Sequence, residues 1–475
     1  MSRRARARIA QAVGDVVFEL SSEFLPFVRG LPCAVMARLI LEWLVDGPTL
    51  AGLFADESIG NYERAFTLSH LTAVMLDVVC GSHPSPRQAF LARQEEMPAS
   101  LSAFYGKLNR VDPSLARALV ERTAARCREV IDVLDARRPQ PLPGYLTKVL
   151  DGNALAGSEH RISELRNTRA AALPGRVLAV YDVATGLIEQ LILWEDGHAQ
   201  ERAALKHLPL QSGMHLLADR NFCVAWFMQA IEDAASHFTI RQHKGSFPLE
   251  TTGELSAWQK RGRCASGSLH ECTLRRMHDE TGMTRIWRVI RLTLDKPTRD
   301  GETEIVLISN LPESVAAAEI AMAYLHRWQI EGHFQRLTDC LHCEVPSLGY
   351  PRAALFAFAA SALAGNAVAL LESAIRAAHG DEKADMLSWF GVAREIASGH
   401  AGMRVALPPD RWQAVQGQTP NVIAKVLEEV ATHANMTRLR KTIRGIKTPR
   451  RTPNCKNIRH VSTHRLLQKS RKKTC

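Results

Sequence analysis

The sequence predicts an α/β fold whose core is interrupted by a β-rich insertion and flanked by helical regions. Three observations support this prediction. Short β-prone runs alternate with helical patterns over residues 144–241. Over residues 242–311 the helical periodicity disappears and β-prone runs follow one another. Helical periodicity returns at residues 312–378, where the core is completed, and it also dominates residues 1–143 and 379–435.

The region before the core, residues 1–143, consists of short helical patterns separated by turn residues. The expected helices span residues 68–79, 87–94, 100–108 and 113–134. A proline-rich run at residues 137–144 then predicts a linker. At the start of the chain, Asp15 and Glu19 interrupt the apolar run that a signal peptide would need, so this segment predicts an amphipathic helix instead.

The elements of the core follow in an order that identifies the type of sheet. Strands are expected at residues 145–150, 176–182 and 187–194, followed by a helix at 200–208, a strand at 214–218, a helix at 224–234 and a strand at 237–241. Three strands followed by helix, strand, helix and strand is the order of the RNase H-like fold. The insertion carries further β-prone runs at residues 271–276, 284–294 and 304–309.

Two aspartates stand where expected strands end. Asp151 follows the run 145–150, and Asp219 follows the mostly apolar run 214–218. The ends of neighbouring strands in an open α/β sheet face one crevice, so the two carboxylates are expected to lie close together. Asp182 and Asp196 compete for this role, but both fall in hairpin turns, where aspartate commonly bonds the local backbone.

A helical pattern in the second part of the core carries a third acid. The apolar residues Ala323, Ile330, Phe334, Leu337 and Leu341 recur along one helix face, and proline is tolerated in a first turn at Pro312. Beside that face, Tyr324, Arg327 and Glu331 are spaced three and four residues apart, so their side chains stack. Such a spacing also fits an Arg/Glu pair on a solvated face, which would contribute about 0.3–0.5 kcal/mol.

Three carboxylates brought together repel each other unless cations neutralise them. Hard oxygen ligands with open coordination positions suit Mg²⁺ or Mn²⁺. A site with two such ions activates the attacking oxygen and stabilises the leaving oxygen in phosphodiester chemistry. Asp151, Asp219 and Glu331 are therefore the candidate catalytic residues and metal ligands.

These residues resemble the DDE transposases of the insertion-sequence-four type, whose glutamate lies in a Tyr-x2-Arg-x3-Glu-x6-Lys signature. Tyr324, Arg327 and Glu331 match this signature in identity and spacing. Asp151 in the segment LDGN and Asp219 in the segment ADRNF correspond to the first and second aspartates. The chain departs from the signature seven residues after the glutamate, where a threonine, residue 338, replaces lysine.

The resemblance implies a cut-and-paste DNA transposase with an RNase H-like catalytic core and two Mg²⁺ ions, for which Mn²⁺ can substitute. It implies that residues 1–143 hold the transposon end, and Tyr324 and Arg327 would position a DNA phosphate near the metal ions. Arg220, next to the second aspartate, is a further candidate for contacting DNA. Weaker candidates, for which a surface or structural role is an equal alternative, are His160, Arg161, Arg241 and Lys244. An aromatic residue of the insertion, such as Trp258 or Trp287, would stack on a flipped base. The partners are double-stranded DNA at the transposon ends and at the target, with a homodimer in the synaptic complex, no membrane, and a location at the nucleoid in a bacterial cytoplasm.

Three other functions use similar residues. An RNase H-like nuclease would use the same acids to cut without joining, although the long insertion favours transposition. A catalytically decayed, DNA-binding derivative is compatible with Thr338, although all three acids are present. A glycosidase also needs paired carboxylates, but it accounts for neither the basic C-terminus nor the helix with Tyr324, Arg327 and Glu331.

Charge and composition further restrict the classes of binding partner and the cellular location. Residues 436–475 contain fourteen Lys and Arg and no Asp or Glu, and removing these charges from the net +11 leaves −3 on the other 435 residues. A basic tail of this kind is typical of a polyanion-binding protein, although a solvated tail has the same composition. Ten scattered cysteines favour a reducing cytosol, and the Cys340–Cys343 spacing lacks the second pair that a structural zinc site needs. Residues 353–371 are uncharged but rich in alanine, which predicts a buried helix instead of a membrane span.

Overall fold

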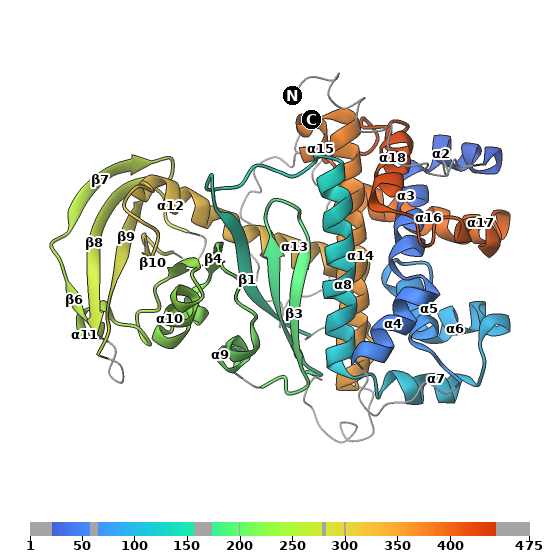
Figure 1. Cartoon of the computed structure of the whole chain (residues 1–475), viewed down its shortest axis with the longest axis horizontal. Helices are drawn as coiled ribbons and strands as arrows, with labels where there is room; N and C mark the ends of the chain where they lie inside the picture. Colours follow the sequence, from blue (N-terminus) through green and yellow to red (C-terminus); the bar gives the residue numbers. More distant parts are fainter. Residues whose placement is uncertain are drawn as a thin grey trace, which may run out of the picture. The chain divides into compact units, whose positions relative to one another are not determined.

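A mixed sheet forms the centre of this computed structural model, with helices on both of its faces (Figure 1). The structure describes residues 21–57, 65–155, 173–198, 200–277, 282–298 and 301–442. Contacts divide the chain into the units Met1–Arg440 and Lys441–Cys475, and all elements named below belong to the first unit. The expected N-terminal amphipathic helix and the tail beyond residue 442 lie outside the described residues.

The sheet has ten strands in the described part of the chain. Their order is β3-β2-β1-β4-β5-β10-β9-β8-β6, with β7 paired to β8. The strands are β1 (Leu146–Ala154), β2 (Arg176–Asp182), β3 (Ile188–Trp194), β4 (Met214–Ala218), β5 (His237–Arg241), β6 (Glu254–Leu255), β7 (Gln259–Cys264), β8 (Gly267–Met277), β9 (Thr284–Leu294) and β10 (Glu304–Ser309). The pairs β1–β4 and β4–β5 are parallel, and the other pairs are antiparallel.

Five strands, β2, β4, β5, β9 and β10, begin and end at the predicted residues. The end of β1 differs from the prediction, and the pairing of β10 was not predicted. Strand β1 does not end before Asp151, because residues 151–154 keep their pairing with β2. Strand β10 pairs with β5, from Ser309 opposite Thr239 to Leu307 opposite Arg241. The strands after residue 242 therefore extend the sheet of the core instead of forming a sheet of their own.

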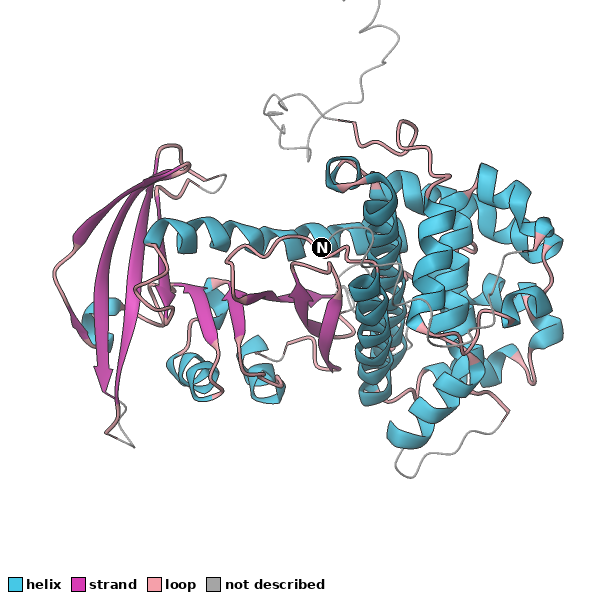
Figure 2. Cartoon of the chain, turned by 45° about the horizontal axis from the view of Figure 1, so that its top comes forward, coloured by secondary structure: helices cyan, strands magenta, loops and turns pink. Residues whose placement is uncertain are grey.

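The two faces of the sheet carry different helices (Figure 2). On one face lie α9 (Glu201–Ala204) and α10 (Ala225–Asp233), and on the other lie α12 (Ala317–Tyr324) and α13 (Trp328–Leu341). Side chains alternate along a strand, so neighbouring residues contribute to different layers. Leu150 packs in the cluster that contains α10 residues, whereas Val149 packs in the cluster that contains α13 residues.

The helix that carries Glu331 differs in detail from the prediction. The predicted helix is divided into α12 and α13, with a turn of 3₁₀-helix, Leu325–Arg327, between them. The first of the two, α12, begins at Ala317 and not near Pro312. The Glu319 side chain accepts a hydrogen bond from the Ala316 N–H at 2.9 Å, which satisfies one of the free donors at the start of α12. The predicted apolar face is confirmed, because all five of its residues are buried.

The N-terminal helices lie next to β3, the edge strand, on the side that faces away from the other strands. They are α2 (Leu25–Gly30), α3 (Pro32–Leu44), α4 (Gly47–Glu57), α5 (Leu68–Val79), α6 (Pro86–Ala92), α7 (Leu101–Leu108) and α8 (Pro113–Val133). Sequence signals at their starts explain these boundaries: Ser100 caps α7, and Asp112 caps α8 ahead of a proline at its first position. Helices α15 (Asp381–Asp385), α16 (Trp389–Ala406), α17 (Pro409–Gln413) and α18 (Pro420–Ala431) follow residue 380.

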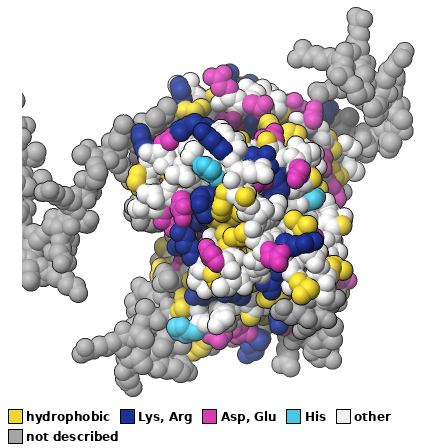
Figure 3. All heavy atoms as spheres, turned by 90° about the vertical axis from the view of Figure 1, so that its left-hand side faces the viewer, with side chains coloured by type: hydrophobic (Ala, Val, Ile, Leu, Met, Phe, Trp, Pro, Cys, Tyr) yellow, Lys and Arg dark blue, Asp and Glu magenta, His cyan; other side chains and the backbone are white. Residues whose placement is uncertain are grey.

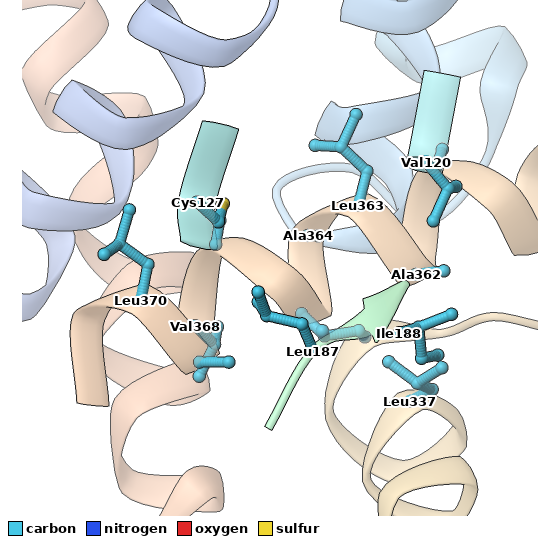
Figure 4. Close-up of a cluster of buried hydrophobic side chains, with 14 of the residues drawn as sticks. Val120, Cys127, Leu187, Ile188, Leu337, Ala362, Leu363, Ala364, Val368 and Leu370 are labelled. Atoms are coloured by element: carbon cyan, nitrogen blue, oxygen red, sulfur yellow. The ribbon is translucent and has the colours of Figure 1, made fainter. Parts of the chain in front are cut away.

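Helix α14 (Pro351–His379) joins the sheet to the flanking helices. It contacts α8, β3 and α13, and Figure 4 shows its apolar residues between Val120 of α8, Ile188 of β3 and Leu337 of α13. By length and composition it could cross a membrane, but its most apolar window is entirely buried in the protein. The Asn366 side chain fixes its position: Oδ1 accepts from the Ile188 N–H at 2.8 Å and Nδ2 donates to the Ile188 carbonyl at 2.9 Å.

We expect Asn366→Leu to destabilise the fold by about 2–4 kcal/mol, because it leaves the buried N–H and carbonyl groups of Ile188 without partners. Denaturant unfolding would measure the change. Ser361→Ala, on the same helix, is the control, since the buried Ser361 hydroxyl has no hydrogen-bond partner among the described residues. Equal losses for the two variants would contradict the role assigned to Asn366.

Candidate active site

Asp151 and Asp219 lie on neighbouring parallel strands. The β1–β4 pairing ends one residue before each of them, so the two aspartates occupy equivalent positions. By the alternation of side chains, they point to the same face as Val149 and Leu217, which pack in the cluster with α13. Asp219 keeps an extended backbone, so this alternation still holds one residue past β4. Both aspartates therefore face the layer that carries Glu331.

Arg327 connects the first and third acids. Its Nη1 donates to Asp151 Oδ2 at 3.4 Å, and its Nη2 lies 2.7 Å from Glu331 Oε1. The Arg327 side chain is only 7% exposed, whereas that of Glu331 is 51% exposed. A buried guanidinium needs carboxylate partners, because an unpaired buried charge is costly. The Arg327–Glu331 pair is therefore not the solvated-face pair that its spacing also allows.

The charges of the three acids act on one another. The pKa of Asp151 is raised from 3.8 to about 6, chiefly by burial and to a smaller extent by the negative charges of Glu331 and Asp219. The Arg327 guanidinium and a hydrogen bond from the Gly152 N–H act in the opposite direction on this pKa. Asp151 is thus a carboxyl group whose ionised form is unfavourable, and added positive charge would relieve it.

Tyr324 is a buried neighbour of Arg327 and does not lie on the surface. Its side chain is buried, and its hydroxyl has no hydrogen-bond partner among the described residues. Burial raises the pKa of the phenol, as does the charge of Asp219, while Arg327 and Arg241 lower it. The centre of the Tyr324 ring is 6.0 Å from the Arg327 guanidinium carbon, so the ring helps to confine that side chain.

Arg220, the third residue predicted to contact DNA, is half-exposed at the mouth of a cleft. Its Nη1 lies 3.2 Å from Glu302 Oε1. The cleft also contains Arg241 and Lys244, which sequence analysis considered as weaker DNA contacts, and Glu304, which pairs with Lys244 at 2.8 Å. Sequence analysis missed Glu302 and Glu304, because nothing in the local pattern indicates that β10 lies beside β5. Two further weak candidates, His160 and Arg161, lie outside the described residues.

Thr338 replaces the lysine of the signature, and this residue and its neighbours contact groups close to them in the chain or in the fold. Thr338 is exposed, and its hydroxyl donates to the Phe334 carbonyl at 3.1 Å. The nearby basic residue Arg336 lies over the Trp389 ring at 5.0 Å, away from the acids. Cys343 is buried, which raises the pKa of its thiol to about 12, so this cysteine remains a neutral thiol.

The two tryptophans of the insertion differ in environment. Trp287 is fully buried, and its Nε1 donates to Glu232 at 3.3 Å, so it is a core residue and is not exposed for stacking on a base. Trp258 is only partly buried, and the Arg291 guanidinium carbon lies 3.9 Å from its ring centre. The outer face of these strands mixes Lys and Arg with Asp and Glu around a group of hydrophobic side chains (Figure 3).

The donor set is chemically suited to a hard divalent cation. Asp151 and Asp219 supply carboxylate oxygens on one face, and the raised pKa of Asp151 marks a place where a cation would be favourable. In the described part of the chain, no three His, Cys, Asp or Glu side chains are close enough to hold a metal ion together. Glu331 is directed to Arg327 instead, so it would have to exchange this partner to complete a three-carboxylate site.

Known proteins are similar to this chain both over its central part and over most of its length. Residues 152–366 match a family model described as a transposase DDE domain, a range that begins one residue after Asp151 and includes Asp219 and Glu331. This match supports a DDE transposase. Among solved structures, a piggyBac transposase synaptic complex with hairpin DNA aligns with 11% identity and a TM-score of 0.39, over 86% of this chain and 87% of that chain. No curated protein matches the sequence.

We expect Asp151→Asn to stabilise the metal-free protein at pH 8. A carboxyl with a pKa of about 6 in the folded state and 3.8 otherwise costs the fold up to about 3 kcal/mol when ionised. That cost is fully present above pH 6 and disappears as the pH falls below about 4. Thermal unfolding in EDTA should therefore show a gain at pH 8 that shrinks at pH 4.5.

The control is Asp196→Asn, since Asp196 is exposed and, among the described residues, accepts a hydrogen bond only from the N–H of His198, in its own turn. A lower stability of Asp151→Asn at pH 8 would mean that the attraction to Arg327 outweighs the burial of Asp151.

Proposed function

We propose that the protein is a DDE transposase that cuts DNA at the ends of an insertion sequence and joins the freed ends to target DNA. The observation that carries this proposal is the placement of three acids on one face of the sheet. Asp151 and Asp219 come from adjacent parallel strands, and Glu331 comes from the helix packed over them, with Arg327 between. The match to the transposase DDE domain supports the same conclusion.

The strand arrangement supports an RNase H-like core. Strands β3, β2 and β1 form an antiparallel meander, and β4 and β5 then add to β1 in parallel through α9 and α10. Helices cover both faces, as an RNase H-like sheet requires. The insertion would occupy the connection between β5 and the helix that carries Glu331.

Each residue near the acids has a role that follows from its environment. Arg327 offsets part of the repulsion between Asp151 and Glu331 and so holds the two carboxylates near each other before substrate binds. Tyr324 limits the positions open to the Arg327 side chain. Arg220, being half-exposed beside Asp219, is placed to contact a phosphate of the DNA strand at the acids.

Asp151, Asp219 and Glu331 would hold Mg²⁺ or Mn²⁺, which when bound supplies charge stabilisation for the attacking and leaving oxygens. Because Asp151 titrates near pH 6, its ionised form is available at neutral pH. The half-exposed Glu331 is the acid of the three that can change partner most easily. The proposal also includes a homodimer on paired DNA ends in a bacterial cytoplasm, as in the family that the sequence resembles.

The test is cleavage and joining of a labelled duplex that carries the DNA end flanking this gene, in the presence of Mg²⁺. We expect nicking and strand transfer by the wild type and a loss of at least about a hundredfold in both for Glu331→Gln, because one of the three proposed ligands is removed. Gel analysis separates nicked from joined products.

Asp196→Asn serves as the matched control for this assay, because it removes one carboxylate from an exposed turn of the same domain. Cleavage without joining by the wild type would favour a nuclease. Binding without cleavage would favour a decayed derivative, and equal activity of Glu331→Gln and wild type would refute the assignment of the acids.

A further inference from the structure

A cleft of about 610 Å³ opens where β5 and β10 meet. Residues 220–221, 241–245, 301–304 and 306 line it. Its first residue, Arg220, directly follows Asp219, so the cleft begins at the proposed active site. Its basic residues come from the end of β5 and from the loops after β4 and β5, and its two glutamates come from the start of β10 and the segment before it.

Every basic side chain that pairs in the cleft pairs with one of two glutamates. Glu302 binds both Arg220, at 3.2 Å, and Arg241. Glu304 binds Lys244 at 2.8 Å and lies 3.9 Å from Arg291 Nε. These hydrogen bonds and charges lower the pKa of Glu302 and of Glu304, so both are ionised at neutral pH.

Two of these ion pairs are open to exchange. The Arg220 side chain is 51% exposed and that of Lys244 is 75% exposed, and ion pairs with such exposure contribute little stability. The Arg241 side chain is only 15% exposed, so its pair with Glu302 is better protected. A phosphate group presents the same kind of acceptor to a guanidinium as a carboxylate does, and arginine binds both with two parallel hydrogen bonds. Glu302 and Glu304 are two residues apart, a separation of about 6.6 Å in an extended chain. This is close to the spacing of neighbouring phosphates in one DNA strand.

Arg241 connects the cleft to the acids. The β4–β5 pairing sets Ala218 opposite Ile240, so Arg241 ends β5 at the level of Asp219 on the neighbouring strand. The charges of Arg241 and Asp219 also both act on the phenol pKa of Tyr324, the first lowering and the second raising it. A DNA strand that is held by Arg220 and Arg241 would lead directly to Asp219.

We infer that this cleft binds two consecutive phosphates of the DNA strand that enters the active site, and that Glu302 and Glu304 occupy the phosphate-binding side chains in the free protein. The inference rests on the proposed function, because DNA is the ligand. Binding of DNA then requires the strand to displace the two carboxylates, which lowers the affinity of the free protein for DNA.

The test compares DNA binding by the full-length wild type and Glu302→Gln, using fluorescence anisotropy of a labelled duplex in EDTA so that no cleavage occurs. We expect Glu302→Gln to bind about tenfold more tightly, because two arginines lose the competing carboxylate. Its plot of log K against log salt concentration should be steeper by about 1, since a further phosphate contact releases counterions. Glutamine keeps the shape of the side chain, and thermal unfolding checks that the variant folds.

Asp295→Asn is the matched control, because it removes one negative charge from an exposed pair with Arg263 that lies outside the cleft. An equal gain for this control would overturn the inference in favour of a general charge effect, and so would unchanged binding by Glu302→Gln. The gain should disappear when Arg220→Gln and Arg241→Gln are added to Glu302→Gln, and its persistence would also overturn the site. If no variant binds DNA, the proposed function fails together with the inference.

Discussion

The parallel pairing of β1 with β4 is the constraint on which the rest of the candidate site depends. It sets Asp151 and Asp219 at the same level and on the same face, so two carboxylates must lie close together in a partly buried place. Such an arrangement is unfavourable by itself: burial, with a smaller contribution from the neighbouring carboxylates, raises the pKa of Asp151. The fold compensates for it with one buried arginine, which a turn of 3₁₀-helix directs toward the strands.

The position of that arginine depends in turn on the packing of α13 and α14. Helix α13 packs on α14, and α14 is fixed to β3 by the two hydrogen bonds of Asn366. Gly365 allows the close approach of these helices, because a Cβ at this position would stand 2.7 Å from Leu337 Cδ2. The flanking helices thus determine where Glu331 can lie relative to the two aspartates.

Local patterns were sufficient to predict most elements and the three acids. Strands such as β2 and β4 are mostly apolar runs bounded by turn residues. The three candidate acids were proposed from spacing and from expected strand ends, and only the strand end before Asp219 is where it was expected, because β1 continues past Asp151. What the sequence could not predict are contacts between distant segments. The sequence after Asp151 contains a turn signal, yet pairing with β2 keeps it in the strand. The burial of Arg327 and the glutamates opposite Arg220 depend on tertiary packing, which no local pattern encodes.

The pairing of β10 with β5 also limits how far the chain can be shortened, because it covers an edge of the sheet. Strand β5 would otherwise be the edge of the parallel part of the sheet, with its backbone N–H and carbonyl groups free to pair with another chain. The segment between β5 and α12 therefore also prevents β5 from pairing with another chain, which would lead to aggregation. A shortened chain that omitted residues 242–311 would keep all three acids but leave the edge of β5 unpaired and open to pairing with another chain.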